Sequence, residues 1–243
     1  MRTNRVFVDT PMLCNQQLLL PEPQSLHLGK VLRLQPGQFV HLFNGAGGYY
    51  RAEIAVVQKR TVTVIPLEFI PDKPAATLRI ILAQGISRGR HMDYTIQKAV
   101  ELGVASIIPL ATDHSNVNLS TQHVANKLNH WRNIIISACE QCGRNNLPGI
   151  VTPVAFDDWV VEVSGTPRLV LDPAATLTLT AITPPPAVLT IISGPEGGLS
   201  EREIILAVRQ NCIAVRLGPR VLRTETAAIA AISASQTLWG DMA

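Results

Sequence analysis

Charge and long apolar runs are both scarce in this chain of 243 residues. Charged residues make up 16% of the sequence, against the roughly 25% that is usual in soluble domains. No apolar run approaches the roughly 20 residues that a membrane-spanning helix needs, and residues 1–9 lack the apolar segment of a secretory signal. We therefore expect a cytoplasmic protein without a membrane partner. Its 47% of apolar residues suffice for the core of one large domain or two small ones.

Cysteine is also rare, and its spacing argues against a metal site. The chain holds four cysteines, Cys14, Cys139, Cys142 and Cys212. Cys139 and Cys142 form a C-x-x-C pair, but a zinc site needs a second ligand pair at similar spacing, and the sequence has none. Because Gly143 follows at once, we expect the pair at the C-terminal end of a helix, where the dipole disfavours a thiolate. We interpret it as two packed thiols and expect no metal.

A dinucleotide fingerprint of the form G-x-G-x-x-G is absent. Its nearest approach, Gly45 to Gly48, precedes an expected strand and not a helix, so we interpret it as a hairpin turn. The net charge of +3 permits an RNA partner without arguing for one.

The first part of the chain, residues 1–72, has the pattern of a β domain. Short runs rich in branched and aromatic residues are separated by the turn signals at 36–37 and 44–48. The expected strands are residues 5–8, 38–43, 49–57 and 61–67, with one helix at 26–34. The proline-bounded stretch 70–74 predicts a domain boundary.

The second part, residues 73–243, alternates strands with helices. The expected strands are residues 78–83, 107–110, 168–171, 188–193 and 213–217, and the expected helices are residues 92–102, 123–142, 200–210 and 224–239. This alternation predicts an α/β domain with a mainly parallel sheet covered on both faces.

A glycine-rich loop, residues 194–198, joins an expected buried strand to a helix. Ser200 and Glu203 form an S-x-x-E capping box that marks the helix start. Glycines let a ligand approach the main chain closely, and ligands of open α/β sheets bind at the carboxyl ends of the strands. A tight turn without a ligand needs fewer glycines, so the loop favours a binding site.

A second loop with the same design follows residues 213–217. Gly218 and Pro219 precede a helix whose start is dense in charge, with Arg220, Arg223 and Glu225. The apolar pair Val221–Leu222 between the arginines suits a pocket wall with charged groups at its mouth.

These segments together resemble the RsmE family. Residues 194–200 (GPEGGLS) and 217–227 (LGPRVLRTETA) are similar to its two C-terminal motifs, residues 97–104 with 108–109 to its upstream motif, and residues 140–144 to the pattern between them. The likeness runs the whole length of the chain.

The resemblance implies the fold and activity of a SPOUT-type methyltransferase. It implies a PUA-like β-barrel that binds RNA at residues 1–72 and a SPOUT α/β domain with a trefoil knot at 73–243. Physical rules make knots almost absent, so the knot follows from the resemblance alone. The implied reaction transfers a methyl group from S-adenosylmethionine to N3 of a uridine in small-subunit (16S) ribosomal RNA. The implied partners are that RNA or the assembled small subunit, and a second copy of the chain in a homodimer.

The motifs carry the site residues over to this chain. The residues expected to bind the cofactor are Leu171, Gly194, Pro195, Gly197, Gly198, Leu217, Gly218, Leu222 and Thr224. The uracil N3 proton has to leave, which requires a general base or a stabilised anion. Glu225 and Glu196 are candidate bases or orienting groups, and Arg223 is the candidate that stabilises charge on a uracil oxygen. No histidine lies in either motif, so an imidazole base is not expected.

RNA binding requires cations, and the expected phosphate partners lie in both parts of the chain. They are Arg2, Arg5 and Arg33 in the first part, with Lys59 and Arg60 nearby, and Arg88 and Arg90 in the loop after residues 78–83.

Three other interpretations stay open. A SPOUT enzyme with another target, a transfer RNA or a ribose hydroxyl, is disfavoured by the β domain and by residues 223–226. A non-catalytic RNA-binding or ribosome-assembly factor would use the glycine loops only as turns. A phosphate-binding site at the Ser200 helix start is disfavoured because Glu196 and Glu201 would repel the anion.

Overall fold

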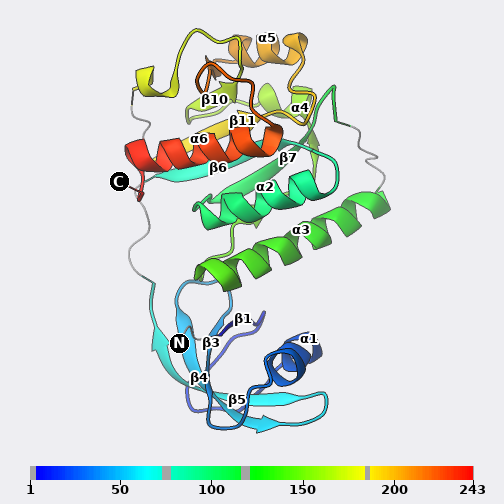
Figure 1. The fold of residues 1–243 in the computed structure, drawn as a ribbon, viewed down its shortest axis with the longest axis vertical. Helices are drawn as coiled ribbons and strands as arrows, with labels where there is room; N and C mark the ends of the chain where they lie inside the picture. Colours follow the sequence, from blue (N-terminus) through cyan, green and yellow to red (C-terminus); the bar gives the residue numbers. More distant parts are fainter. Residues whose placement is uncertain (1–3, 73–77, 116–120, 184–186, 243) are drawn as a thin grey trace. The chain divides into compact units, whose positions relative to one another are not determined.

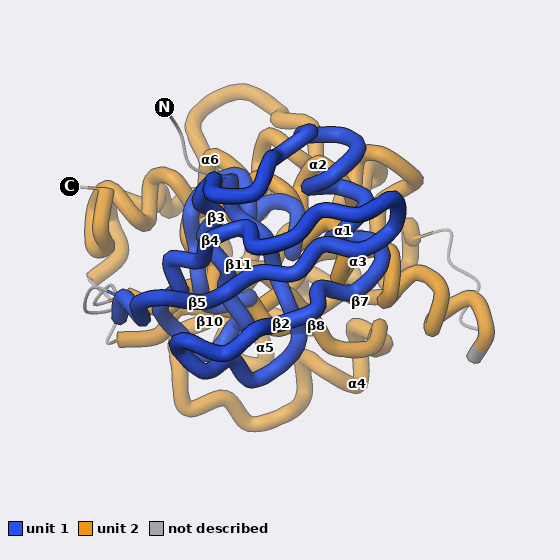
Figure 2. The backbone as a smooth tube through the Cα atoms, turned by 90° about the horizontal axis from the view of Figure 1, so that it is seen from below, with its two compact units in different colours: residues 1–75, 136–147 blue, residues 76–135, 148–243 orange. Residues whose placement is uncertain are grey.

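The computed structural model describes residues 4–72, 78–115, 121–183 and 187–242, and it divides into two compact units. Unit 1 comprises residues 1–75 and 136–147, and unit 2 comprises residues 76–135 and 148–243 (Figure 2).

Unit 1 is built on a curled five-stranded sheet in the order β1-β3-β4-β5-β2. Its strands are β1 (Arg5–Phe7), β2 (Leu18–Leu19), β3 (Phe39–Phe43), β4 (Tyr49–Val57) and β5 (Val62–Ile70). Strand β1 runs parallel to β3, and the other neighbours are antiparallel. The residues that face the core alternate along each strand, as in a sheet with one covered face. The predicted β character of this part is confirmed.

The predicted helix of unit 1 starts earlier than the periodicity indicated. Helix α1 (Glu22–Leu26) begins after Pro21 and continues as a π-helical turn (His27–Val31), so the helical stretch ends before residue 34. Proline is tolerated in a first helical turn, because the N–H that it lacks has no partner there. Arg33, with a φ of 52°, turns the chain away from the helix.

Residues 136–147 return to unit 1 from far along the chain. They hold the C-terminal end of helix α3 (Thr121–Cys142). Glu140 Oε1 accepts a hydrogen bond from Phe7 N at 2.9 Å, and Asn146 Nδ2 donates one to Asp72 Oδ2 at 2.9 Å. Burial raises the pKa of Glu140. Residues 140–144, which resemble a family pattern, thus pack within unit 1. The sequence had not predicted that they belong to the first part of the fold.

Unit 2 is built on a parallel sheet in the order β12-β10-β11-β6-β7-β8, with β9 pairing with β7. Its strands are β6 (Arg79–Gly85), β7 (Ser106–Ala111), β8 (Gly149–Ile150), β9 (Val154–Ala155), β10 (Arg168–Leu171), β11 (Val188–Ser193) and β12 (Ile213–Val215). Every pairing among them is parallel, as predicted. The two-residue strands β8 and β9 were not predicted.

Helices cover both faces of this sheet. Helices α2 (Arg90–Glu101) and α6 (Thr224–Trp239) lie side by side on one face (Figure 1). On the other face, α4 (Phe156–Val160) and α5 (Glu201–Arg209) pack against Ala83, Val170 and Ile192. A 3-10 turn (Leu179–Ala181) precedes β11. Within the described residues, no helix is long and apolar enough to span a membrane.

The four cysteines are free thiols, and their environments predict different reactivity. Burial raises the pKa of Cys139 to about 12 and also raises the pKa of Cys212, whereas Cys14 is exposed. Because the thiolate is the nucleophile, we expect a thiol reagent near neutral pH to label Cys14 in the folded protein. We expect Cys139 and Cys212 to react only after unfolding. Peptide mass spectrometry of the labelled protein, with Cys14→Ser as control, measures this; rapid labelling of Cys139 would contradict it.

Candidate active site

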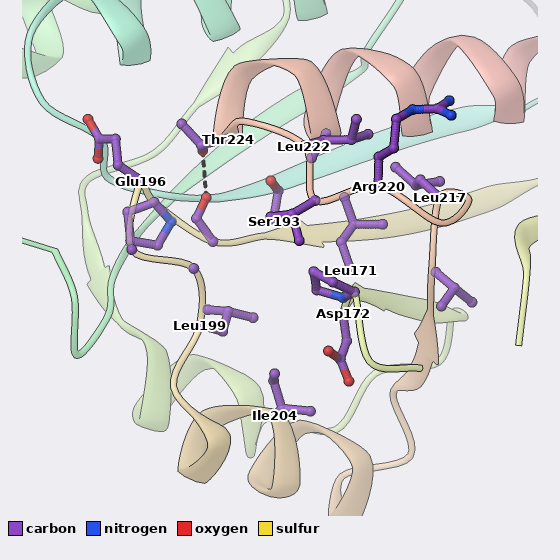
Figure 3. Close-up of a pocket in the computed structure, with 18 residues that line it drawn as sticks. Leu171, Asp172, Ser193, Glu196, Leu199, Ile204, Leu217, Arg220, Leu222 and Thr224 are labelled. Atoms are coloured by element: carbon purple, nitrogen blue, oxygen red, sulfur yellow. Dashed lines mark hydrogen bonds between the residues drawn. The ribbon is translucent and has the colours of Figure 1, made fainter. Parts of the chain in front are cut away.

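A cavity of about 320 Å³ opens at the carboxyl edge of the parallel sheet of unit 2. Three loops form it, and they follow β10, β11 and β12, which are neighbours in the sheet (Figure 3). Its volume lies in the range of about 300–1,000 Å³ that small-molecule sites occupy. The position is the one that open α/β sheets use for ligands.

The loop after β11 holds its shape through glycine. A Cβ at Gly194 would lie 2.6 Å from Leu199 N and 2.7 Å from Gly198 C, distances that no side chain tolerates. Gly198 has a φ of 71°, in the left-handed region that favours glycine. The loop leads into α5 through Ser200, whose predicted capping box with Glu203 is present. Gly194 and Gly198 thus allow a backbone conformation of this loop that residues with a side chain cannot adopt.

Three segments far apart in the sequence meet next to the cavity: the end of β6, the loop after β11 and the start of α6. Gln84 at the end of β6 is fully buried, and its Nε2 donates to Gly194 O at 3.0 Å and Thr224 Oγ1 at 3.1 Å. Thr224 Oγ1 in turn donates to Gly194 O at 2.6 Å (dashed in Figure 3). Gly85 is so close to the next loop that a Cβ there would lie 2.5 Å from Pro195 Cδ. These contacts fix the β11 loop against the start of α6.

Charged side chains lie around a mainly apolar interior. Leu171, Ile204 and Leu222 line the cavity, together with two acidic groups, Asp172 and Glu196. The basic Arg220 completes the set. Glu196 and Arg220 lie at opposite edges in Figure 3. The cavity therefore suits a ligand with an apolar body and more than one charge.

The structure brings together most residues that were predicted to bind the cofactor. Leu171, Gly194, Pro195, Gly197, Gly198, Leu217, Leu222 and Thr224 all line the cavity. Gly218 does not line it. It adjoins Leu217 with a φ of 82° and so shapes the β12 loop instead.

The three predicted catalytic residues do not share one surface of the cavity. Glu196 lines the cavity, and its Oε1 accepts a hydrogen bond from Arg88 N at 2.7 Å. Arg223 is the exposed residue that precedes α6 and is not among the lining residues. Glu225, in the first turn of α6, lies with its Oε2 3.3 Å from His91 Nδ1. The catalytic roles of Arg223 and Glu225 stay predictions, because neither residue is among those that line the cavity.

The predicted RNA-binding arginines have different surroundings. Arg88 and Arg90 are exposed beside Gly89 at the start of α2, on the same edge of the sheet as the cavity. Arg33 is exposed in unit 1. Arg5 is half-buried, bonds to Asn145 Oδ1 and lies 5.2 Å from the Phe43 ring centroid. Burial lowers the pKa of Arg5. Arg2 lies outside the described residues.

Several cavity residues were missed by sequence reasoning. They include Asp172, Pro173, Ser193, Leu199, Ile204 and Ala227. Asp172 and Pro173 follow β10 directly, so the rule about carboxyl ends of strands could have found them. Ile204 and Ala227 lie inside helices, where only packing brings them to the cavity. No cluster of three or more histidine, cysteine, aspartate or glutamate residues suited to a metal occurs among the residues that the structure describes.

Comparison with known proteins relates both parts of the chain to RNA methyltransferases. A family model of an RNA methyltransferase domain matches residues 74–236, and a model of an RNA methyltransferase PUA domain matches residues 20–67. Ribosomal RNA small subunit methyltransferase E of Buchnera aphidicola (subsp. Schizaphis graminum) is 35% identical over 99% of this chain and 98% of its own length.

Solved structures agree with the sequence matches. Ribosomal RNA small subunit methyltransferase E of Neisseria gonorrhoeae, bound to S-adenosylmethionine, is 35% identical, with a TM-score of 0.93 and all of both chains covered. A Legionella pneumophila methyltransferase, also bound to that cofactor, is 41% identical, with a TM-score of 0.95 over 99% of this chain and 100% of that one.

The parallel sheet, the three-loop cavity and these matches define an RNA methyltransferase. More narrowly, the chain belongs to the ribosomal RNA small subunit methyltransferase E family.

Proposed function

We propose that the protein transfers a methyl group from S-adenosylmethionine to N3 of a specific uridine in 16S ribosomal RNA, acting on the assembled small subunit. The observation that carries the proposal is the three-loop cavity, whose lining includes eight of the nine predicted cofactor residues. Relatives that cover the whole chain are named for small-subunit ribosomal RNA methylation. A ribosomal RNA substrate also supports a cytoplasmic location.

The chemistry of the cavity fits this cofactor. S-adenosylmethionine carries a sulfonium and an ammonium, both positive, and one carboxylate. The cavity offers the Asp172 carboxylate for a cation, and Arg220 is the basic residue at its edge (Figure 3). The backbone of the β12 loop, from which Leu217, Val221 and Leu222 line the cavity, is proposed to bind the polar edge of adenine, and Leu171 and Leu222 suit its faces. Gly194 and Gly197 let the loop pack closely on its own backbone and on His114, which shapes this wall of the cavity.

When bound, S-adenosylmethionine supplies an electrophilic methyl group. The residues of this chain then hold cofactor and base in line, which is the main contribution that an enzyme makes to such a displacement. The nine residues that we propose for the cofactor are Leu171, Gly194, Pro195, Gly197, Gly198, Leu217, Gly218, Leu222 and Thr224.

Removal of the N3 proton of uracil is the second requirement. A carboxylate, Glu225 or Glu196, accepts this proton, and the guanidinium of Arg223 stabilises the negative charge on a uracil oxygen. Glu225 Oε2 lies 3.3 Å from His91 Nδ1, and Glu196 Oε1 accepts a hydrogen bond from Arg88 N. Glu225 directly follows Thr224, which lines the cavity, and Glu196 lines the cavity itself.

Substitution of Arg223 tests this assignment. We expect Arg223→Ala to lower kcat by about 100-fold, the usual cost of one anion-stabilising donor. The dissociation constant for S-adenosylmethionine should stay unchanged, because Arg223 is exposed outside the cavity lining. Arg209→Ala, at the exposed end of α5, is the control. Glu225→Gln and Glu196→Gln in the same assay identify the base. Full turnover by Arg223→Ala would remove it from the mechanism.

The RNA is bound by both units. We assign residues 1–72 to a PUA-like β-barrel and residues 73–243 to a SPOUT domain. The curled sheet of unit 1 and the PUA-domain match support the barrel. Exposed Arg33 in unit 1, and Arg88 and Arg90 beside the cavity, are the phosphate partners. Arg5 and Arg2 belong to the same proposal.

A trefoil knot in unit 2 is part of the proposed fold. The match of residues 74–236 to the RNA methyltransferase domain supports it. A homodimer is proposed through α2 and α6. On these two helices Tyr94 of α2 and Leu238 of α6 are 47% and 44% exposed. The small residues Ala230 and Ser233 of α6 are partly exposed. Sedimentation equilibrium of the protein measures the dimer.

Nucleoside mass spectrometry tests the reaction. The protein and S-adenosylmethionine are incubated with small ribosomal subunits and with naked 16S RNA, and 3-methyluridine is measured. We expect the nucleoside to form on the subunit. Its absence from both substrates would refute the proposed reaction. Calorimetry with the cofactor then separates an RNA methyltransferase of another target, which binds it, from a non-catalytic RNA-binding factor, which does not.

A further inference from the structure

A fourth segment, residues 112–115 after β7, contacts the glycine loop from outside the cavity. His114 Nδ1 lies 3.1 Å from Gly198 O, and because a carbonyl only accepts, Nδ1 carries the hydrogen. The same side chain packs against Gly197, where an added Cβ would lie 3.0 Å from His114 Cβ. None of residues 112–115 lines the cavity. Residues 112–115 therefore affect the cavity only through their contacts with the glycine loop, which forms one wall of it.

Asp113 joins this segment to the end of the glycine loop. Its Oδ2 accepts a hydrogen bond from Ser200 Oγ at 2.6 Å. Arg202 donates to both of its oxygens, from Nη2 at 2.8 Å and from Nε at 3.2 Å. Bonds from Arg202 and Ser200 lower the pKa of Asp113, so the carboxylate stays charged at neutral pH. The Asp113 side chain thus binds both Ser200, the last residue of the segment 194–200 that holds the glycine loop and leads into α5, and Arg202 within α5.

Glu203 makes the second connection between the same two segments. This carboxylate is fully buried, and both of its oxygens accept from backbone N–H groups. Oε2 accepts from Ser200 N at 2.8 Å, closing the capping box, and Oε1 accepts from Asp113 N at 2.9 Å. The buried charge is therefore satisfied by one N–H from each segment. The pairing fixes the end of β7 relative to the start of α5.

We propose that Asp113 is a positioning residue, which holds the loop 194–200 in the shape that binds the cofactor. The proposal rests on the proposed function, because it names a residue that does not line the cavity but contacts the segment that forms one of its walls. Gly194 fixes one end of the loop through Gln84 and Thr224. Asp113 and Glu203 fix the other end at Ser200. A glycine-rich stretch has many alternative conformations, so restraint at both ends lowers the entropy lost on binding.

A second aspartate, Asp157, allows the positioning role of Asp113 to be distinguished from its ion pair with Arg202. Arg202 Nη1 also donates to Asp157 Oδ2 at 2.8 Å, and Asp157 has no bond to Ser200 among the described contacts. Both aspartates are partly exposed partners of the same guanidinium, with side-chain exposures of 39% and 50%. Asp157→Ala removes an ion pair of Arg202 and leaves the contact to the loop. It is therefore the matched control for Asp113→Ala.

Calorimetric titration with S-adenosylmethionine is the test. We expect Asp113→Ala to raise the dissociation constant about tenfold and Asp157→Ala to leave it unchanged, with similar small losses in Tm for both variants. Asp113→Glu, which restores the carboxylate, should recover part of the affinity. In the methylation assay Asp113→Ala should raise KM for the cofactor and leave kcat at saturation unchanged. A residue with only a structural role would not produce this split.

The outcomes are distinct. Failure of the unsubstituted protein to bind the cofactor would refute the proposed function itself. Normal binding by the unsubstituted protein and by Asp113→Ala would refute only the positioning role. Equal weakening by Asp113→Ala and Asp157→Ala would also refute it, because the effect would then belong to the ion pairs of Arg202. If Asp113→Ala does not fold, Ser200→Ala removes the same bond together with the cap bond from Glu203 N, and Ser200→Asp, which keeps an acceptor for that cap bond, is its control.

Discussion

Gly194→Ala should strongly weaken the binding of S-adenosylmethionine while the protein stays folded. The added Cβ would lie 2.6 Å from Leu199 N, so the backbone of residues 194–199 has to move. That loop is one wall of the cavity. Relief of this contact needs a shift of the loop of about 1 Å, and we expect the dissociation constant to rise by about 100-fold or more. Isothermal titration with the cofactor measures the change.

Gly165→Ala is the matched control for this variant. Gly165 lies in the same unit, and a Cβ there would meet no atom within 4 Å. Gly197→Val is a second, weaker case, because its side chain would press on His114 and not on the backbone. Cofactor binding by Gly194→Ala at the affinity of the control would show that the loop does not form the binding site.

Thr224→Val should lower both the stability of unit 2 and its affinity for the cofactor. Valine keeps the shape of threonine but loses the hydroxyl that donates to Gly194 O and accepts from Gln84 Nε2. Both partners lie at a buried crossing, and loss of such bonds costs about 1–3 kcal/mol of unfolding free energy. The crossing holds two walls of the cavity together, so we expect the dissociation constant to rise about tenfold.

Thr226→Val controls for the effect of valine at the start of α6. Thr226 lies two residues further along the same helix and is exposed. Denaturant unfolding and calorimetry of the two variants give the comparison. Equal stability and affinity for both would mean that the bonds of Thr224 contribute nothing to the site.

Much of unit 2 is predictable from the sequence because its signals are local. The longer strands of the parallel sheet are rich in apolar residues, and glycine or proline lies at or just beyond the ends of β6, β10 and β11. The capping box at Ser200 and Glu203 is present, and α5 starts one residue after the predicted first residue, with Ser200 as its N-cap. Once the strand ends are known, the rule for ligand sites in open sheets leads to residues 194–198 and 217–222.

The parts that could not be predicted depend on partners far along the chain. The strands β8 and β9 have two residues each, and only their pairing with β7 makes them strands. Asp113 meets Ser200 across 87 positions, and no local pattern marks that contact. Glu203 was read as a capping residue, but its second bond, to Asp113, is tertiary. Helix periodicity likewise gave no sign that α3 ends in unit 1.

The division of α3 between the two units has a consequence for the order of synthesis. Domains generally fold from the N-terminus as they leave the ribosome, but unit 1 lacks Glu140 and Asn146 until residue 147 has been made. By then β6, α2 and β7 of unit 2 have already been synthesised. The Phe7 N–H and the Asp72 carboxylate have to wait for these partners. The first unit to begin is therefore completed only after the second has started, so nascent chains shorter than 147 residues hold neither unit in finished form.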